Sequence, residues 1–178
     1  QLDGASGFDE IDEMKRHVKQ VTEWQNRLEK VYSKFESDRD RDDLSKLEAL
    51  HEETRSHGFR YKALVQLEQK LERAYSLQHR IRIWQDAETN ESLKFVTNIV
   101  RDITKLKMRF PAVNDMLAFH RNLEMWVERA NVAIRSRISV SEIESLIATG
   151  NTMKVDVSEY LEKLQSRVDV AKEWLQQF

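Results

Sequence analysis

The side chains in this sequence best suited to metal chemistry are five histidines, and their spacing does not form a known metal-binding pattern. His51 is followed by a glutamate, as in H-E-x-x-H, where two histidines one helical turn apart bind zinc. Arg55 occupies the position of the second histidine, and the chain has no cysteine for a thiolate zinc site. The sequence therefore predicts no metal ligand. We interpret His120, which lies on an apolar stripe, as a core histidine bonded to a neighbouring helix.

Acidic side chains are frequent, but their surroundings do not favour acid–base catalysis. The chain has 31 Asp and Glu against 29 Lys and Arg, and mixed charge at this density is typical of solvated helix faces. Glu159 and Lys163 have the spacing of an exposed helical ion pair. The glycines are isolated, so there is no glycine-rich loop that could bind phosphate. We expect no catalytic residue and no cofactor site in this chain.

Three short clusters combine cationic and aromatic side chains, a chemistry that suits contact with nucleic-acid phosphates or an acidic partner. They span residues 55–62, 79–84 and 105–110. The helix dipole also favours cations near helix C-termini, so an electrostatic role within the chain is the alternative. The first and third clusters form a candidate basic edge, which comprises Arg55, Arg60, Lys62, Lys105, Lys107 and Arg109.

The elements that must position these residues are predicted to be helices. One proline and four glycines are too few for the frequent turns of a β protein. No apolar run approaches the ~20 residues that span a bilayer. Apolar residues instead recur three and four positions apart, which places them on one face of a helix. The predicted helices span residues 9–37, 43–57, 61–88, 91–108, 112–137, 140–149 and 156–178, after a short polar lead at residues 1–8.

Specific residue types mark several of the predicted helix ends. Gly58 is placed where a helix-terminating residue adopts a positive φ angle, and Gly150 is expected to close the helix at residues 140–149. Ser139 with Glu142, and Ser141 with Glu144, are two overlapping pairs with the spacing of a capping box, in which each side chain binds the backbone N–H of the other residue. Asp156 is the expected cap of the last helix, because a short carboxylate accepts the free N–H groups of the first turn.

The apolar stripes predict an all-α fold in which helices pack along their length. We expect a single domain over residues 9–178, an elongated array of about seven antiparallel helices with coiled-coil-like or spectrin-like packing. The large side chains expected to anchor the core are Trp24, Trp84, Trp126 and Trp174. The last helix keeps a period of about 3.5 residues throughout. Its candidate partner-docking residues are Leu164, Val168, Leu175 and Phe178.

The order of the helical segments resembles a known family. The resemblance is carried by LSKLEALHEETRSHGF at residues 44–59, FHRNLEMWVERANVAI at 119–134 and SEIESLIATGNTMKVDVSEYLEKLQSRVDVAKEW at 141–174. These segments resemble the PLU-like helical region of the Lid/Jarid family of JmjC histone lysine demethylases and their fungal relatives. The resemblance extends over nearly the whole chain, from Met14 onward.

This resemblance implies a nuclear chromatin regulator whose chemistry takes place outside the present segment. In the family, iron and 2-oxoglutarate serve a JmjC domain and zinc serves flanking modules, and nothing in this chain matches those domains. The resemblance therefore implies a non-catalytic scaffold that spaces catalytic and reader domains. The implied partners are other domains of the parent chain and subunits of chromatin complexes, among them a histone deacetylase complex.

Two other functions fit the same helical pattern. A spectrin-type cytoskeletal spacer shares the buried tryptophans and the heptads, but it consists of regular three-helix units, whereas the predicted helices are uneven in length. A nucleosome-contacting or DNA-contacting helical arm would use the basic edge, and its affinity would fall steeply with salt. The regularity of the helical repeat therefore distinguishes a spectrin-type spacer from a scaffold, and the salt dependence of DNA binding identifies a DNA-contacting arm.

Overall fold

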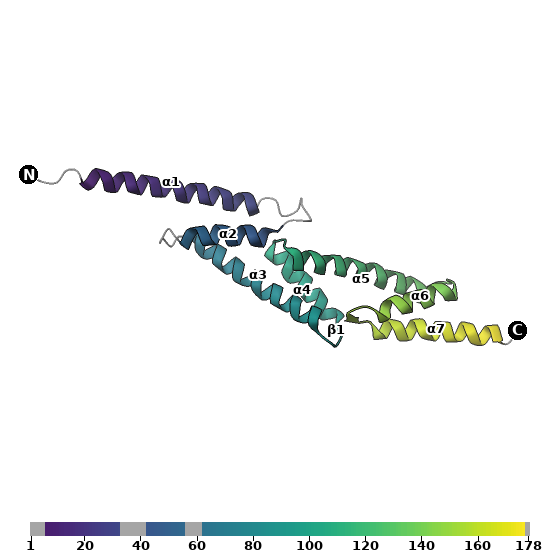
Figure 1. The fold of residues 1–178 in the computed structure, drawn as a ribbon. Coiled ribbons are helices and arrows are strands. Elements are labelled where there is room, and N and C mark those ends of the chain that lie inside the picture. Colours follow the sequence, from purple (N-terminus) through teal and green to yellow (C-terminus); the bar gives the residue numbers. More distant parts are fainter. Residues whose placement is uncertain (1–5, 33–41, 56–61, 177–178) are drawn as a thin grey trace, which may run out of the picture. The chain divides into compact units, whose positions relative to one another are not determined.

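The computed structural model describes residues 6–32, 42–55 and 62–176, and the described chain is almost entirely helical (Figure 1). Seven α-helices in these ranges confirm the predicted all-α fold. They are α1 (Ser6–Tyr32), α2 (Asp43–Arg55), α3 (Lys62–Asp86), α4 (Leu93–Leu106), α5 (Pro111–Arg135), α6 (Val140–Asn151) and α7 (Ser158–Gln176). Two short strands, β1 (Glu91–Ser92) and β2 (Val155–Asp156), pair in parallel and were not predicted. None of the described helices combines the length and the apolar character that crossing a bilayer requires.

The end of the sixth helix differs from the prediction. Gly150 does not close α6, because the helix continues to Asn151 and Thr152 is its C-cap. Gly150 is buried inside the helix, where a Cβ atom would lie 2.6 Å from Cζ2 of Trp126. The glycine thus permits a close approach between helices and does not terminate one. Gly58, the other predicted terminator, lies outside the described residues.

The first of the two capping boxes predicted for α6 is present, and so is the carboxylate predicted to cap α7, whereas Ser141 lies inside α6 and is not its N-cap. Ser139 is the N-cap of α6, and its side chain and that of Glu142 form the reciprocal bonds of a capping box. Before α7, Oδ1 of Asp156 accepts hydrogen bonds from the backbone N–H of Ser158 at 3.0 Å and from its hydroxyl at 2.6 Å. The first of these bonds satisfies a backbone N–H that a helix start leaves without a partner.

The chain forms two compact units, and each is described by itself. The N-terminal unit comprises the described part of residues 1–76 together with Leu106–Pro111. The C-terminal unit comprises Leu77–Lys105 and the described residues from Ala112 onward. Helix α3 therefore contributes its first part to the N-terminal unit and its last part to the C-terminal unit. The single domain and the elongated antiparallel array stay predictions.

The core of the N-terminal unit is formed by α1, α2, the first part of α3 and the end of α4 with the connection that follows. Its buried apolar residues are Trp24, Leu28, Leu44, Leu47, Leu50, Leu64, Leu67, Leu71, Ala74, Leu106, Met108 and Phe110. Asp43, the first residue of α2, is also buried. Its N–H donates to the Arg109 carbonyl at 2.6 Å, and its Oδ2 accepts the Arg109 N–H at 3.1 Å. These bonds satisfy a buried carboxylate and attach the start of α2 to residues 106–111.

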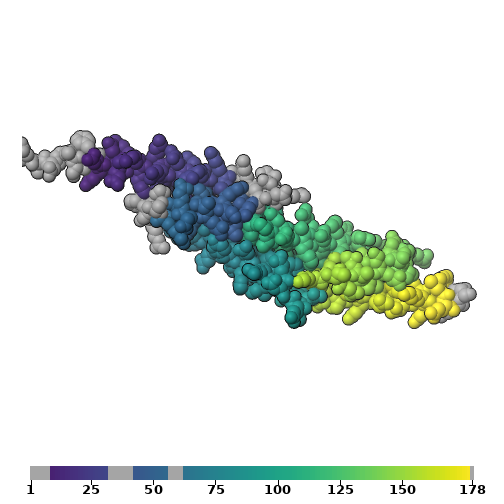
Figure 2. Space-filling model, viewed as in Figure 1, coloured from purple at the N-terminus to yellow at the C-terminus, as the bar shows by residue number. Residues whose placement is uncertain are grey.

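The core of the C-terminal unit is formed by the last part of α3 together with α4, α5, α6 and α7. Its buried residues include Ile81, Val96, Ile99, Ile103, Val113, Met116, Leu123, Ile143, Leu146, Leu164 and Val168. The β1–β2 pair joins the segment before α4 to the segment before α7. Helices α6 and α7 pack directly against each other, and they lie side by side in the space-filling view (Figure 2).

Candidate protein-docking surfaces

Three of the four tryptophans expected in the core are buried. Trp24, Trp84 and Trp126 are 1%, 6% and 4% exposed. Each indole N–H donates to a backbone carbonyl elsewhere in its own unit, since a buried donor without an acceptor would be costly. The donor and acceptor pairs are Trp24 with Leu50 at 2.8 Å, Trp84 with Lys154 at 3.0 Å, and Trp126 with Leu146 at 3.0 Å. Each bond therefore fixes one helix against a segment distant in sequence.

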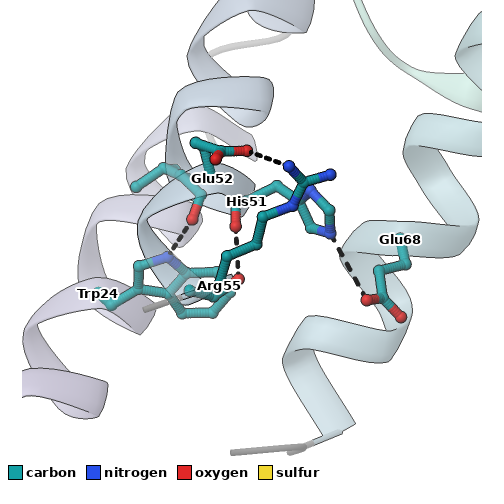
Figure 3. Close-up of polar contacts among 7 residues, drawn as sticks. Trp24, His51, Glu52, Arg55 and Glu68 are labelled. Carbon is teal, nitrogen blue, oxygen red and sulfur yellow. Dashed lines mark hydrogen bonds and ion pairs between the residues drawn. The ribbon is translucent and has the colours of Figure 1, made fainter. Parts of the chain in front are cut away.

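Helix α2 receives polar contacts from both α1 and α3 (Figure 3). The Trp24 indole points toward α2 from α1, and Nε2 of His51 lies 3.5 Å from Oε1 of Glu68 on α3 (Figure 3). Arg55, a residue of the candidate basic edge, is exposed and pairs with Glu52 one turn earlier at 3.0 Å. Its charge is therefore compensated locally, although an exposed pair of this kind contributes little to stability.

The remaining residues of the candidate basic edge are distributed over both units. Lys62, Lys105 and Lys107 are exposed, Arg109 is half-buried, and Arg60 lies outside the described residues. Lys105 belongs to the C-terminal unit, whereas the other described members belong to the N-terminal unit. Contact with DNA through these residues stays a prediction.

The histidines and carboxylates do not gather into a metal site within residues 6–32, 42–55 and 62–176. His120 is half-buried, and its Nδ1 lies 3.4 Å from the carboxylate of Glu124, one turn along the same helix. The expected bond from this histidine to a neighbouring helix was therefore wrong. Residues four apart meet on the surface of any helix, so a partner on the same element was available.

Helix α7 is buried along its middle and exposed toward its end. Leu164 and Val168, expected to dock a partner, are 0% and 1% exposed because they pack into the core of the C-terminal unit. They present no surface to a partner, and the docking role is not carried forward for them. Trp174, expected in the core, is instead 60% exposed, and Leu175 is 63% exposed. Phe178 lies outside the described residues.

The three cations of α7 are engaged within the C-terminal unit. Arg167 donates to the carbonyls of Ala133 at 2.8 Å and Ile134 at 2.6 Å. These carbonyls belong to the last turn of α5, where helical partners are lacking. The two lysines form ion pairs, Lys163 with Glu159 at 2.5 Å and Lys172 with Glu144 of α6 at 2.7 Å. Two of the three cations therefore tie α7 to its neighbours.

A groove of about 820 Å³ runs between α4 and α5. Its apolar lining comes from both helices and consists of Leu93, Val100, Leu123, Val127 and Val132. Its titratable lining residues carry both signs of charge and are Arg101, His120, Glu124, Glu128 and Arg135. An apolar floor with charged walls is the arrangement that binds amphipathic helices in grooves. The stripes in the sequence predicted both helices, but they contained no signal for the groove.

A second groove, of about 640 Å³, lies between α6 and α7. Its apolar lining residues are Ile147, Leu161 and Val170. Its charged lining residues are all acidic and are Glu162, Asp169 and Glu173, with no cation among the described residues that line it. The two grooves therefore differ in charge, since the first carries both signs and the second only negative charge.

Comparison with known proteins places this C-terminal region in a family. A family model described as PLU-1-like protein matches residues 78–178. These residues contain the last part of α3 and all of α4, α5, α6 and α7, and hence both grooves. A search of curated proteins and a search of solved structures returned no match.

Proposed function

The chain belongs to the PLU-1-like protein family, and on this basis we propose that it is a non-catalytic helical region of a JmjC-family chromatin protein. Its role is to dock other domains of the parent chain, or subunits of a nuclear chromatin complex, onto a helical scaffold. The matched residues 78–178 correspond closely to the C-terminal unit. This correspondence supports a function that resides in that unit.

The groove between α4 and α5 is the observation that carries this proposal. Val132 is 51% exposed, and Val100 and Val127 are half-buried. Apolar surface thus remains accessible after the unit has folded. An amphipathic helix that enters the groove would remove this surface from water, which favours association by about 25 cal/mol for each Å² buried.

The charged walls of the groove favour one orientation of a docked helix. Glu124 and Glu128 lie one turn apart on α5, Arg135 is the last residue of α5, and Arg101 lies on α4. A partner helix with cations beside the two glutamates and carboxylates beside the two arginines would match this pattern. Complementary charge of this kind selects the register and the partner more than it adds affinity.

The two helices that form the groove, α4 and α5, are held in place by contacts with α3 and α6. Trp126 attaches α5 to α6 through the Leu146 carbonyl. Arg80 of α3 pairs with Asp102 of α4 at 2.7 Å. A groove that is formed before the partner arrives requires little ordering on binding, which preserves affinity.

Charge introduced into the apolar lining of the groove tests the docking function in the full-length parent protein. Val127→Glu combined with Val132→Glu should abolish recovery of the subunits that copurify with the wild-type parent, because a carboxylate would be buried unpaired. Met125→Glu is the matched control, since Met125 lies on the same helix, is 56% exposed and lines neither groove. Unchanged recovery with an intact fold, judged by circular dichroism and melting temperature, would refute the docking function.

The non-catalytic part of the proposal has a separate test. It assigns iron, 2-oxoglutarate and zinc to other domains of the parent chain. The purified chain, supplied with iron, 2-oxoglutarate and a methyl-lysine peptide, should give no turnover above the reaction without protein. Turnover that depends on the chain would overturn this assignment and leave the docking test unaffected.

A further inference from the structure

The groove between α6 and α7 retains exposed apolar surface. Ile147, Leu161 and Val170 contribute its apolar lining. Val170 is 63% exposed, so folding of the C-terminal unit leaves this part of the groove uncovered. Apolar surface with a polar border is typical of protein interaction sites.

A row of carboxylates borders this apolar surface. Glu162, Asp169 and Glu173 are successive acidic lining residues of α7, seven and four positions apart. This spacing places them along one side of the helix over about 16 Å, at ~1.5 Å per residue. Oδ1 of Asp169 accepts a hydrogen bond from the side-chain amide of Gln165 at 2.8 Å. That bond orients the carboxylate without neutralising its charge.

The cations of α7 compensate this row only in part. Lys163 pairs with Glu159, Lys172 pairs with Glu144, and Arg167 donates to carbonyls of α5. Helix α6 has no lysine or arginine within Val140–Asn151. Lys172 also attracts the Asp169 carboxylate, so the negative charge is reduced at that position. The charged residues that line the groove are nevertheless all acidic, which favours a positively charged ligand.

An exposed aromatic side chain follows the groove on α7. Trp174 lies one turn beyond Val170 and is 60% exposed. Residues four apart share a helix face, so a ligand long enough to continue along α7 beyond Val170 would reach the indole. Indole rings bind lysine and arginine cations better than other aromatic rings do.

We propose that the groove between α6 and α7 binds a cationic amphipathic protein segment. Lysine or arginine side chains of the segment pair with Glu162, Asp169 and Glu173, and its apolar side chains cover Ile147 and Val170. A purely apolar partner would desolvate the carboxylates without pairing them, and nucleic acid would be repelled by them. This surface is separate from the α4–α5 groove, so either proposal can fail without the other.

Synthetic peptides test the ligand chemistry with the full chain. The probe is a labelled amphipathic helical peptide with lysine and arginine on one face and leucine on the other. Two matched peptides replace the cations with glutamate or the leucines with serine. The basic amphipathic peptide should bind and weaken as salt rises, and both substituted peptides should bind at least about tenfold more weakly. Absence of binding by the basic peptide, or equal binding by the glutamate peptide, would overturn the proposal.

Variants of the chain then locate the site. Glu162→Gln, Asp169→Asn and Glu173→Gln together should weaken binding of the basic peptide by about tenfold or more. The control removes the same charge at exposed positions outside the groove, with Glu72→Gln, Glu88→Gln and Asp115→Asn. The control variant should lose less than about twofold in affinity for the basic peptide.

Equal losses in the two triple variants would show general electrostatic attraction and would refute the site. Val170→Gln changes no charge and alters an exposed residue. It should also weaken binding, and unchanged affinity would refute the apolar part of the proposal. Circular dichroism establishes whether each variant is folded. Should the triple variant unfold, Glu162→Gln and Glu173→Gln, made singly at exposed positions, must each weaken binding for the proposal to stand.

Discussion

The indole N–H of Trp126 donates a hydrogen bond of 3.0 Å to the backbone carbonyl of Leu146. This bond joins α5 to α6 beside Gly150. A Cβ atom on Gly150 would lie 2.6 Å from Cζ2 of Trp126 and 2.8 Å from Cδ2 of Leu161 on α7. The ring of Tyr160 also meets the Trp126 ring edge-on, with centroids 5.9 Å apart. Three helices of the C-terminal unit therefore meet around one buried indole.

Gly150→Ala should destabilise the chain, although alanine is normally favoured over glycine inside a helix by about 1 kcal/mol. The new Cβ would collide with Trp126, whose ring is buried and held by a hydrogen bond. We expect a net loss of about 1–3 kcal/mol in the free energy of unfolding, measured by urea denaturation. Thr149→Ala, at the preceding exposed position, should change it by about 0.5 kcal/mol or less. A stabilised Gly150→Ala variant would show that the helices separate easily.

Trp126 and Trp174 should respond differently to truncation. Trp126→Ala should cost about 3–5 kcal/mol, because it leaves a large cavity among three helices. Trp126→Phe keeps an aromatic ring but removes the N–H donor, and we expect an intermediate loss of about 1–3 kcal/mol. Trp174→Ala should cost about 0.5 kcal/mol or less, since that side chain is 60% exposed. Similar melting temperatures for the two alanine variants would contradict this assignment of core and surface.

Lys107→Gly should stabilise the chain. Lys107 follows the last residue of α4 and has a φ angle of 52°, which is a left-handed conformation that glycine adopts without strain. We expect the free energy of unfolding to rise by about 0.5–1 kcal/mol, as measured by thermal or urea denaturation. Lys105→Gly provides the opposite control, because Lys105 lies in the last turn of α4 and glycine there should cost up to about 1 kcal/mol. Destabilisation by both substitutions would show that the Lys107 side chain outweighs the backbone strain.

The capping box of α6 should make stability depend on pH in the acidic range. The hydroxyl and the backbone N–H of Ser139 donate to the Glu142 carboxylate, at 2.8 Å and 3.1 Å, and lower its pKa below the usual 4.5. A carboxylate whose pKa is lowered by folding stabilises the folded state above its unfolded pKa. This contribution is lost as pH falls through the folded pKa.

Glu142→Gln keeps an acceptor but removes the charge, so it should remove this dependence on pH. The difference in the free energy of unfolding between wild type and variant should be largest at neutral pH. It should shrink as the pH falls below 4.5 and through the folded pKa of Glu142. Urea titrations across this range measure it. The control is Glu88→Gln, an exposed carboxylate in the connection after α3. A difference that grows toward low pH would have the wrong sign and would contradict the role of the carboxylate.

The sequence alone determined the helices of this protein, but not the short strands β1 and β2. Apolar spacing located all seven described helices, and the scarcity of proline and glycine excluded a β fold. The capping box at Ser139 and Glu142 was also predicted correctly. These features depend on residues within one or two turns of each other, so local spacing contains the information. The family match over residues 78–178 covers two of the three motifs that resemble the PLU-like region, those at 119–134 and 141–174.

Only the tertiary structure decided which parts of the stripes are covered. Leu164 and Leu175 occupy the same stripe of α7, but Leu164 is 0% exposed and Leu175 is 63% exposed. A stripe shows which face of a helix can be buried, whereas burial itself requires another helix opposite each position. The same reason applies to Gly150 and Trp126, whose close approach joins residues of two helices. The acceptors of the buried indoles are backbone carbonyls, which every residue carries, so no residue type could identify them. The two grooves depend on side chains from paired helices that leave space between them, and such space arises only when the helices pack.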